Sequence, residues 1–363
     1  MTLSENLFAA LAGKPHDDIP FFADLSWHYA AMEAQNRLDV RYQGPDGYLR
    51  YHTDLGVGVC FYAPFLWQTE YTDVKVTVKE SNGRRTMTYT TTKGELRQID
   101  DYIPGANTYG IREHFIKNIE DLRIMTYIAE DARHTANFAP YLETAALWED
   151  RGVAVAMAPV CVSPLQSMLT RWAGVESTYE ILADDGDEAM ELFKRISTAD
   201  DPIYKILADS PAGYIEFPEN LSSEITGVYN FKKYNAPIYK ERIDLLQKAG
   251  KYVGIHIDGT LRGCLELLAE CGFDAAESVT PAPTGDISLD ALRTKAGDIV
   301  IWGGIPGALF SPLFVEDVFK KHIDDIIHNF GQDTRFVLGV ADQVPPDGLL
   351  SRVAYAAKKI NSG

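Results

Sequence analysis

Lys251-Tyr-Val-Gly-Ile-His-Ile-Asp-Gly259 is the stretch that most restricts the fold of this chain. Residues 252–257 are apolar and rich in β-forming types, and glycines lie on both sides of them, which predicts a buried strand. Residues 261–271 carry apolar side chains at helical spacing and are followed by another glycine, which predicts a helix. Because side chains alternate along a strand, His256 and Asp258 point the same way at its carboxyl end. Enzymes with parallel sheets place their chemistry at that end.

The same alternation of strand and helix continues through the second half of the chain. Strands are expected at residues 19–25, 153–159, 214–217, 252–257, 273–279, 299–302 and 335–340, with helical patterns between them. Seven to eight such units predict a closed (β/α)8 TIM barrel, formed by a single domain over residues 1–363. An open doubly wound sheet is the alternative. The chain has no GxGxxG or GxxxxGKS loop, which argues against a nucleotide-binding sheet of that kind.

Residues 71–99 interrupt this alternation. Val74, Val76 and Val78 alternate with polar residues, Asn82-Gly83 is a turn signal, and residues 86–92 alternate again. This pattern predicts a β-hairpin inserted into the N-terminal part of the barrel, and a third strand near Leu96 is an open alternative. A lid or cofactor platform and an excursion without function are equally good interpretations of such an insertion.

Composition excludes several classes of partner. A net charge of -18 argues against nucleic acid and against an anionic membrane surface. The N-terminus lacks the pattern of a signal peptide, and no apolar run is long enough to span a bilayer. The four cysteines form no CxxC pair, so a reducing cytoplasm is expected. A small-molecule substrate is therefore expected; whether the chain forms a homodimer is left open.

Polar residues gather at the predicted strand ends. In a barrel these ends share one face, and clustered carboxylates there repel one another unless they bind protons or cations. Each residue alone is more often structural, as in an ion pair without catalysis. Taken together they predict catalytic roles for His256, Asp258, Glu219 and Asp342, and a divalent metal held by His256, Asp258 and Glu277.

A second group of residues at or near these ends is expected to bind substrate. Aromatic rings there could form the apolar walls of a small-molecule pocket, although ordinary core packing is the better interpretation for Phe217 and Phe310. The predicted substrate-binding residues are Asp24, Trp27, His28, Asn220, Tyr229, Trp302 and Gln343.

Three segments resemble the uroporphyrinogen decarboxylase superfamily. The segments are Asn6-Leu-Phe-Ala-Ala-Leu-Ala-Gly-Lys-Pro-His-Asp-Asp-Ile-Pro20, Pro237-Ile-Tyr-Lys with Gly250-Lys-Tyr-Val-Gly-Ile-His256, and Cys271-Gly-Phe-Asp-Ala-Ala-Glu277. The resemblance implies a (β/α)8 barrel. The arginine run that follows the first strand of the haem-pathway decarboxylase is absent, since residues 24–29 read Asp-Leu-Ser-Trp-His-Tyr. The resemblance is therefore nearer to the corrinoid-dependent methyltransferases of the superfamily.

That branch implies a zinc site and a corrinoid carried by a partner protein. His256 matches its zinc-binding histidine and Glu277 its glutamate, whereas Asp258 and Asp342 stand where it has cysteines. Carboxylates make a harder and weaker site than thiolates, so a thiol is a doubtful methyl acceptor. The implied function is methyl transfer from a small methylated compound, such as a methoxylated aromatic, to a corrinoid protein. The alternatives are a metal-free decarboxylase or lyase acting on a small organic acid and a non-catalytic ligand-binding barrel.

Overall fold

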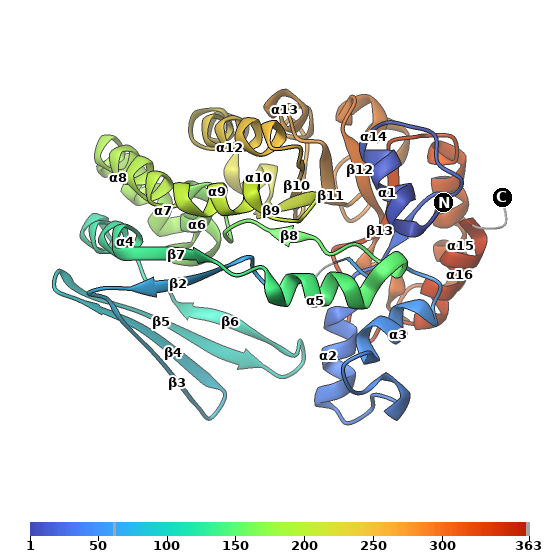
Figure 1. Cartoon of the computed structure of the whole chain (residues 1–363), viewed down its shortest axis with the longest axis horizontal. Helices are drawn as coiled ribbons and strands as arrows, with labels where there is room; N and C mark the ends of the chain where they lie inside the picture. The colour runs from blue at the N-terminus through green and yellow to red at the C-terminus, as the bar shows by residue number, and fades with distance from the viewer. Residues whose placement is uncertain (61–62, 361–363) are drawn as a thin grey trace.

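A computed structural model describes residues 1–60 and 63–360 of the chain. In this part, seven parallel strands form one curled sheet in the order β1-β13-β12-β11-β10-β9-β8. These strands are β1 (Phe21–Phe22), β8 (Ala156–Met157), β9 (Tyr214–Leu221), β10 (Tyr252–Ile257), β11 (Ala275–Val279), β12 (Val300–Pro306) and β13 (Phe336–Ala341). The sheet is TIM-barrel-like, with helices packed around it (Figure 1), so the predicted α/β class is confirmed at that level.

The two edges of the sheet are joined by isolated bridges. In the described residues, the edge strands β1 and β8 do not pair with each other. Instead Phe22 bridges Gly58, and Val59 bridges Gly152, both in parallel orientation. An eighth strand is thus reduced to single contacts around residues 58–59. The predicted first strand over residues 19–25 is also shorter, because only Phe21–Phe22 has ladder pairing.

Helices connect the strands, and the helix predicted over residues 261–271 is shorter in the structure, as α13 (Leu265–Cys271). The helices around the sheet are α1 (Leu3–Leu11), α2 (Ser26–Ala34), α3 (Gly47–Thr53), α5 (Ala139–Trp148), α6 (Pro164–Ser167), α7 (Gly174–Asp184), α8 (Gly186–Ala199), α9 (Asp201–Asp209), α10 (Ser223–Thr226), α11 (Val228–Asn230), α12 (Ala236–Lys248), α13 (Leu265–Cys271), α14 (Leu289–Ala296), α15 (Glu316–Phe330) and α16 (Leu350–Ile360). Two π-helical segments, η3 (Met168–Trp172) and η4 (Phe231–Asn235), and the 3₁₀ segments η1 (Val40–Tyr42), η2 (Glu149–Arg151) and η5 (Gly307–Phe310) complete the connections. No described helix has the length and apolar character that crossing a membrane requires.

Alternation along the strands produces two apolar layers. Ile215 and Phe217 of β9 face outward and join the large core between sheet and helices. Tyr214 faces the other way, into a smaller cluster that includes Trp302 and Leu7 of α1. Helix α1 begins with a capping box formed by Thr2 and Glu5. Since α1 packs on the inward-facing residues, the carboxyl ends of the strands remain for a functional site.

The insertion is larger than the predicted hairpin. β3 (Lys75–Ser81) and β4 (Arg84–Thr91) pair around the Asn82-Gly83 turn, but the sheet continues with β5 (Gly94–Ile103) and β6 (Thr108–Glu113). A separate antiparallel pair, β2 (Trp67–Tyr71) and β7 (Ala132–Ala136), flanks α4 (Ile119–Asp131). The segment expected as a hairpin over 71–99, with a third strand near Leu96, thus belongs to a larger four-stranded sheet that the sequence analysis did not predict in full. Figure 1 shows the four-stranded sheet at the opposite end of the molecule from α15 and α16.

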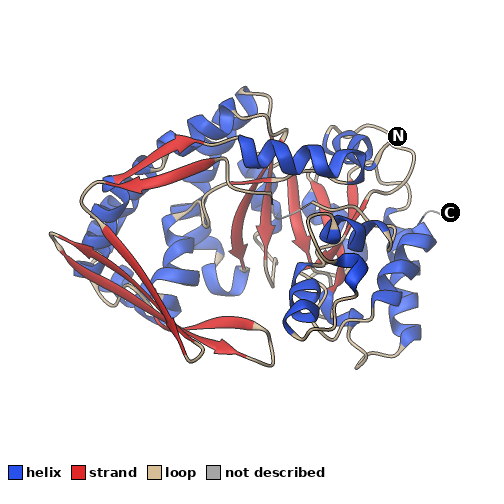
Figure 2. Ribbon diagram, turned by 60° about the horizontal axis from the view of Figure 1, so that its bottom comes forward, coloured by secondary structure: helices blue, strands red, loops and turns tan. Residues whose placement is uncertain are grey.

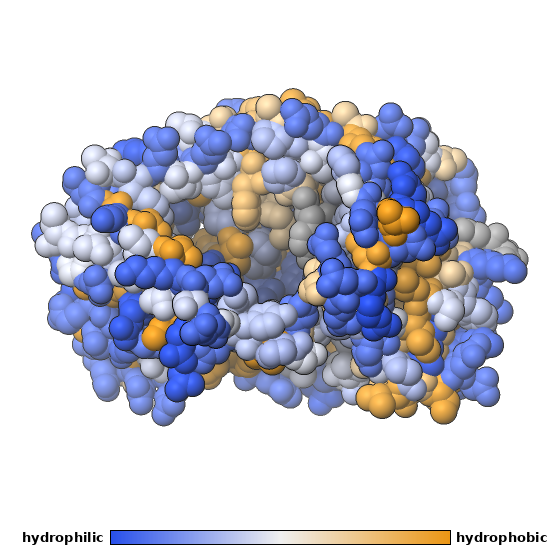
Figure 3. Space-filling view, turned by 90° about the horizontal axis from the view of Figure 1, so that it is seen from below, coloured by the Kyte–Doolittle hydropathy of each residue, from blue (hydrophilic) through white to orange (hydrophobic). Residues whose placement is uncertain are grey.

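The strand directions identify the face on which a site would lie. In Figure 2 the central strands run side by side, and their arrowheads turn toward the lower part of the view. Figure 3 looks at the molecule from below, and this face is hollowed at its middle. The carboxyl ends of the parallel strands thus turn toward a concave face, as expected for enzymes with this type of sheet.

Candidate active site

A close histidine–glutamate pair lies at the carboxyl ends of β10 and β11. His256 and Glu277 are register partners on these adjacent parallel strands. The Nδ1 atom of His256 is 2.5 Å from Oε2 of Glu277. The side chain of His256 is 18% exposed and that of Glu277 is 4% exposed, so little water screens their attraction. The structure thus brings together two residues that the sequence analysis expected as ligands of one metal.

Asp342 approaches the same imidazole from its other side. It directly follows β13, and its Oδ1 is 3.5 Å from Nε2 of His256. The Asp342 side chain is 42% exposed, in contrast to the buried Glu277. The imidazole of His256 therefore lies between one buried carboxylate and one carboxylate that solvent or a substrate can reach.

A third carboxylate, that of Glu216 on β9, extends the buried part of this cluster. Its Oε2 accepts a 2.5 Å hydrogen bond from the hydroxyl of Tyr214, whereas its Oε1 has no hydrogen-bond partner among the described residues. Gly254 of β10 stands opposite Glu216 in the register. A Cβ atom on Gly254 would lie 1.6 Å from the Tyr214 hydroxyl oxygen, so glycine provides the space for both side chains. The sequence analysis assigned no role to Glu216; the glycine inside the neighbouring strand was the available signal.

Burial and mutual repulsion make this cluster retain protons. Burial raises the pKa of Glu216, and the charge of Glu277 raises it further. Burial also raises the pKa of Glu277. Burial alone would lower the pKa of His256, but the carboxylates of Glu277 and Asp342 raise it to about 10. Burial raises the pKa of Asp342 to about 6, and Glu277 adds to that rise.

Replacing Glu216 with glutamine is expected to change how stability depends on pH. The folded-state pKa of Glu216 is raised, so the folded protein holds this proton more tightly and loses stability as pH rises above about 4.5. Glu216→Gln removes that loss, and we expect the variant to gain about 1–3 kcal/mol relative to wild type between pH 5 and pH 8. Urea unfolding across this range measures the effect. Glu224→Gln, at an exposed carboxyl, is the control; parallel profiles for Glu216→Gln and wild type would contradict the burial argument.

Three other predicted residues lie around the cluster. Asp24 accepts hydrogen bonds from the Ser26 backbone and hydroxyl, and from Nε2 of Gln343 at 3.0 Å. The charge of Asp24 raises the pKa values of both Glu277 and Asp342, which places it beside the cluster. Asp258 is exposed and contributes to the rise in the pKa of Asp342.

The predicted catalytic residue Glu219 belongs to a different polar group. It is fully buried and accepts hydrogen bonds from the backbone N–H of Val162 and from the Tyr239 hydroxyl, the latter at 2.7 Å. Burial raises the pKa of Glu219 to about 7. Its partners tie β9 to the start of α6 and to α12, so the structure gives Glu219 a connecting position rather than one beside His256.

Two of the predicted substrate-binding residues are engaged in the helices around α2. The Nδ1 of His28 lies 2.8 Å from the hydroxyl of Tyr51, and the His28 side chain is buried. Trp27 donates from Nε1 to the carbonyl of Ala106 at 2.7 Å, so it connects α2 to the insertion. Neither contact involves His256.

The remaining three predicted residues are dispersed. Trp302 is 1% exposed and packs inside the sheet against Phe22 and Tyr214, at ring-centroid distances of 5.5 and 5.8 Å. Tyr229 on α11 is 72% exposed. Asn220 is exposed, with its backbone in the left-handed region. Trp302 is thus core, contrary to the expectation of a pocket wall.

The predicted zinc ligands do not converge as a metal site would require. Nδ1 of His256 is engaged by Glu277, its Nε2 faces Asp342, and Asp258 is exposed. Over residues 1–60 and 63–360, no three His, Cys, Asp or Glu side chains are grouped so that they could hold a metal ion. The arrangement therefore does not fit the tetrahedral N, O and S site that Zn²⁺ prefers.

A curled parallel sheet with a buried histidine–carboxylate cluster at its carboxyl ends defines a TIM-barrel-like enzyme class. The chain belongs to the uroporphyrinogen decarboxylase (URO-D) family, whose model matches residues 106–362. The sequence resemblance is thereby confirmed. None of the curated proteins compared with this sequence matches it.

Solved structures agree with this fold. A methyltransferase from Methanosarcina mazei superposes with a TM-score of 0.60 at 12% sequence identity, and the match covers 99% of each chain. A B12-independent methionine synthase from Shewanella sp. W3-18-1, in complex with selenomethionine, gives a TM-score of 0.47 at 10% identity, over 96% of this chain and 98% of that one. The likeness to the Methanosarcina mazei structure, which has the higher TM-score, supports the fold of this chain and nothing further.

Proposed function

We propose that this protein transfers a methyl group from a small methylated compound, such as a methoxylated aromatic, to a corrinoid carried by a partner protein. Membership of an enzyme family and the resemblance of the three sequence segments support methyl transfer. The observation that carries the site chemistry is the imidazole of His256 between buried Glu277 and half-exposed Asp342. In this proposal residues 1–363 form one catalytic unit.

In this proposal Asp342 is the proton donor. The bond between the methyl carbon and the substrate oxygen breaks, both electrons stay on the oxygen, and that oxygen takes the proton of Asp342. The methyl group is accepted by the corrinoid, which would supply the nucleophile. A carboxyl with a pKa of about 6 is a better general acid near neutral pH than an imidazolium with a pKa of about 10. His256 then positions Asp342 and stabilises its carboxylate after the proton has left.

Charge favours this reaction over the decarboxylation of a small acid. The carboxylates of Glu277, Asp342 and Glu216 raise the pKa of His256, and those of Asp24 and Asp258 act on the pKa of Asp342. The charges that shift the pKa values of Glu277 and Asp342 are carboxylates and His256 itself. A substrate carboxylate at the reacting position would be repelled there. Methyl transfer requires no negative group at that position. We therefore favour methyl transfer over the decarboxylase or lyase alternative.

The rate of the proposed reaction is expected to fall as pH rises above about 6. Burial raises the pKa of Asp342 to about 6, and above that pH the proton donor is progressively lost, about tenfold per pH unit. Asp342→Asn should lower kcat/KM about 10²–10⁴-fold and abolish this pH dependence. Asp258→Asn removes a charge that raises the pKa of Asp342, so its profile should shift to lower pH. An Asp342→Asn enzyme that keeps the wild-type pH profile would assign the proton to another group.

One doubly labelled compound tests both reactions. 4-Methoxybenzoate carrying ¹³C in the methoxy and carboxyl groups is incubated with the purified protein and chemically reduced cobalamin as the acceptor. Labelled methyl on the cobalamin, together with 4-hydroxybenzoate, supports methyl transfer, whereas labelled CO₂ and methoxybenzene support the lyase alternative. If the wild-type protein forms neither methylated cobalamin with 4-hydroxybenzoate nor CO₂ with methoxybenzene, the result counts against a methoxylated aromatic as the substrate. Repeating the assay after chelation decides whether Zn²⁺ is required.

A further inference from the structure

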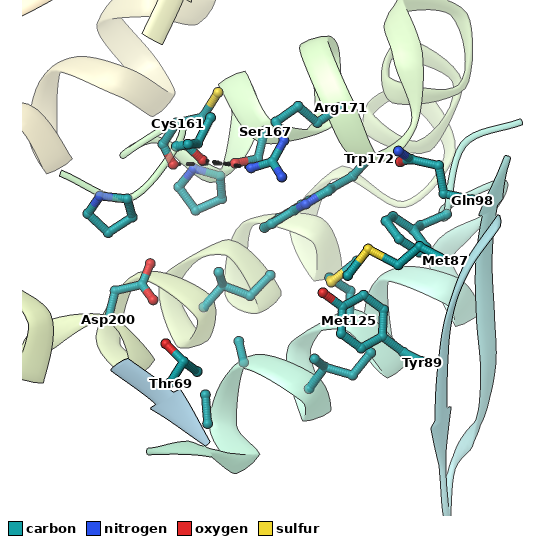
Figure 4. Close-up of a pocket in the computed structure, with 18 of the residues that line it drawn as sticks. Thr69, Met87, Tyr89, Gln98, Met125, Cys161, Ser167, Arg171, Trp172 and Asp200 are labelled. Atoms are coloured by element: carbon teal, nitrogen blue, oxygen red, sulfur yellow. Dashed lines mark hydrogen bonds between the residues drawn. The ribbon is translucent and has the colours of Figure 1, made fainter. Parts of the chain in front are cut away.

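A second feature of the molecule is a cavity of about 630 Å³ between the insertion and the barrel. Its walls come from the four-stranded sheet, the β2–β7 pair, α4, η3 and the segment that follows β8. Figure 4 shows these walls around an open space, with Tyr89, Met87 and Trp172 on one side and Cys161 and Asp200 on the other. A cavity of this size is typical of sites for small organic molecules.

The apolar walls of this cavity are packed and aromatic. Tyr89 contacts Phe115 at a ring-centroid distance of 5.3 Å. Phe115 belongs to a further hydrophobic core, separate from the two layers of the parallel sheet, and Trp172 and Met87 pack against this core. That core also contains Met125, which lines the cavity from α4. Flat rings and thioethers held in this way favour a planar, apolar ligand body, because aromatic pairs and sulfur–aromatic contacts add to burial.

Two charged groups face this space from different sides. Burial raises the pKa values of Tyr89 and Cys161, and the guanidinium of Arg171 lies close enough for its charge to oppose that rise in both. Among the described residues Arg171 donates to the carbonyl of Val160 at 3.2 Å and makes no ion pair with a carboxylate. In Figure 4 Arg171 extends toward the space from above Trp172, and Asp200 reaches it from the opposite side. Burial raises the pKa of Asp200 to about 7.

We propose that this cavity binds an aromatic monocarboxylate, with the ring between the aromatic and methionine walls and the carboxylate on Arg171. An arginine guanidinium pairs with a carboxylate through parallel hydrogen bonds. Arg171 has no carboxylate partner among the described residues of this chain of charge -18, so it can bind the carboxylate of a ligand. Asp200 gives selectivity, because a second carboxylate at the far end of the ring would meet its negative charge. A neutral or hydrogen-bonding substituent is accepted there.

The cavity adjoins the strand ends that carry the catalytic cluster. Its wall includes Pro159 and Cys161, which follow β8. The backbone N–H of Ala158 donates to the carbonyl of Glu216 at 2.8 Å, and that of Cys161 donates to Pro218, the register partner of His256. Among the described residues, His256, Glu277 and Asp342 are not part of the cavity lining, so the inference goes beyond the proposed function and assigns a binding site beside the reacting position; the binding does not depend on turnover.

Calorimetric titration of the full-length protein at pH 8 tests the proposal with three probes. Benzoate should bind wild type, while terephthalate, which has a second carboxylate opposite the first, should bind at least tenfold more weakly. Benzyl alcohol has no carboxylate and should bind wild type and Arg171→Gln alike. Arg171→Gln should weaken benzoate about ten- to a hundredfold, and Arg171→Lys less than that, because the positive charge is kept. Arg112→Gln, on the insertion sheet but outside the cavity lining, should leave benzoate binding unchanged.

Asp200→Asn provides an independent measurement that does not disturb Arg171. Removing the charge of Asp200 should bring terephthalate binding close to that of benzoate. Equal benzoate binding by Arg171→Gln and wild type, or no benzoate binding by wild type at millimolar concentration, would overturn the proposal. If benzoate binds as described but the labelled methoxybenzoate is not demethylated, the cavity assignment stands and the proposed reaction fails. If the methoxybenzoate is demethylated without benzoate binding, the reverse holds.

Discussion

Replacing His256 with asparagine should lower kcat/KM for the proposed methyl transfer by about 10²–10⁴-fold, the range typical of losing a group in acid–base catalysis. Asparagine keeps a polar side chain of moderate size but cannot become cationic. The carboxylates of Glu277 and Asp342 would then face each other without the imidazolium between them. Both would take up protons more readily, and Asp342 would lose the positive charge that stabilises it after proton transfer.

Two comparisons make this prediction specific. His328→Asn, at an exposed position on α15, should keep wild-type activity. The double variant His256→Asn with Glu277→Gln should be only slightly less active than His256→Asn alone, because residues that act as a unit do not contribute additively. Losses that multiply in the double variant would show that Glu277 acts independently of His256, and an active His256→Asn would remove the imidazole from the mechanism.

The sequence was sufficient to place His256 and Glu277 at the same edge of the sheet, although as ligands of one metal and not as a hydrogen-bonded pair. Both follow apolar runs that form adjacent parallel strands, and the alternation of side chains fixes the face on which each emerges. Asp342 could be added for the same reason, since it follows the apolar strand β13. These predictions depend on local periodicity and on the rule that parallel strands end on one face, and both apply without knowledge of distances.

Glu219 shows where that reasoning fails. Counting from inward-facing Tyr214, alternation places Glu216 inward and Glu219 outward, and the structure has this arrangement. The pairing of β9 with β10 also shifts register at this point, so that two residues of β9 have no partner. A strand end judged only by its polar residues does not reveal this direction. Counting the alternation of side chains along the strand would have shown that Glu216 and Glu219 point to opposite faces of the sheet.

The insertion was underestimated for a different physical reason. β3 and β4 alternate valine or threonine with polar residues and were visible in the sequence. β6 and β7 are short strands with mostly exposed or half-buried residues, and neither carries a regular apolar face. Such strands are stabilised by pairing with neighbours that are distant in sequence, as β7 pairs with β2 across about 60 residues. A single-sequence pattern has no access to that pairing.

Trp302→Ala is expected to cost about 3–5 kcal/mol of folding free energy, the range observed when a large buried aromatic side chain is removed. Trp302 is 1% exposed and fills the interior of the sheet between Phe22 and Tyr214, against the layer that α1 covers. The space left by its indole cannot close, because the surrounding strands are fixed by their ladder of hydrogen bonds. Urea unfolding monitored by circular dichroism measures the loss.

Tyr229→Ala is the matched comparison, since both residues were expected from the sequence to line a substrate pocket. Tyr229 is 72% exposed, and its removal should change the unfolding free energy by no more than about 0.5 kcal/mol. If Trp302 instead contacted substrate, Trp302→Ala would raise KM while the unfolding free energy stayed near that of wild type. The two variants therefore separate packing from substrate binding, because Trp302 lies in a closed layer below the strand ends at which His256, Glu277 and Asp342 meet.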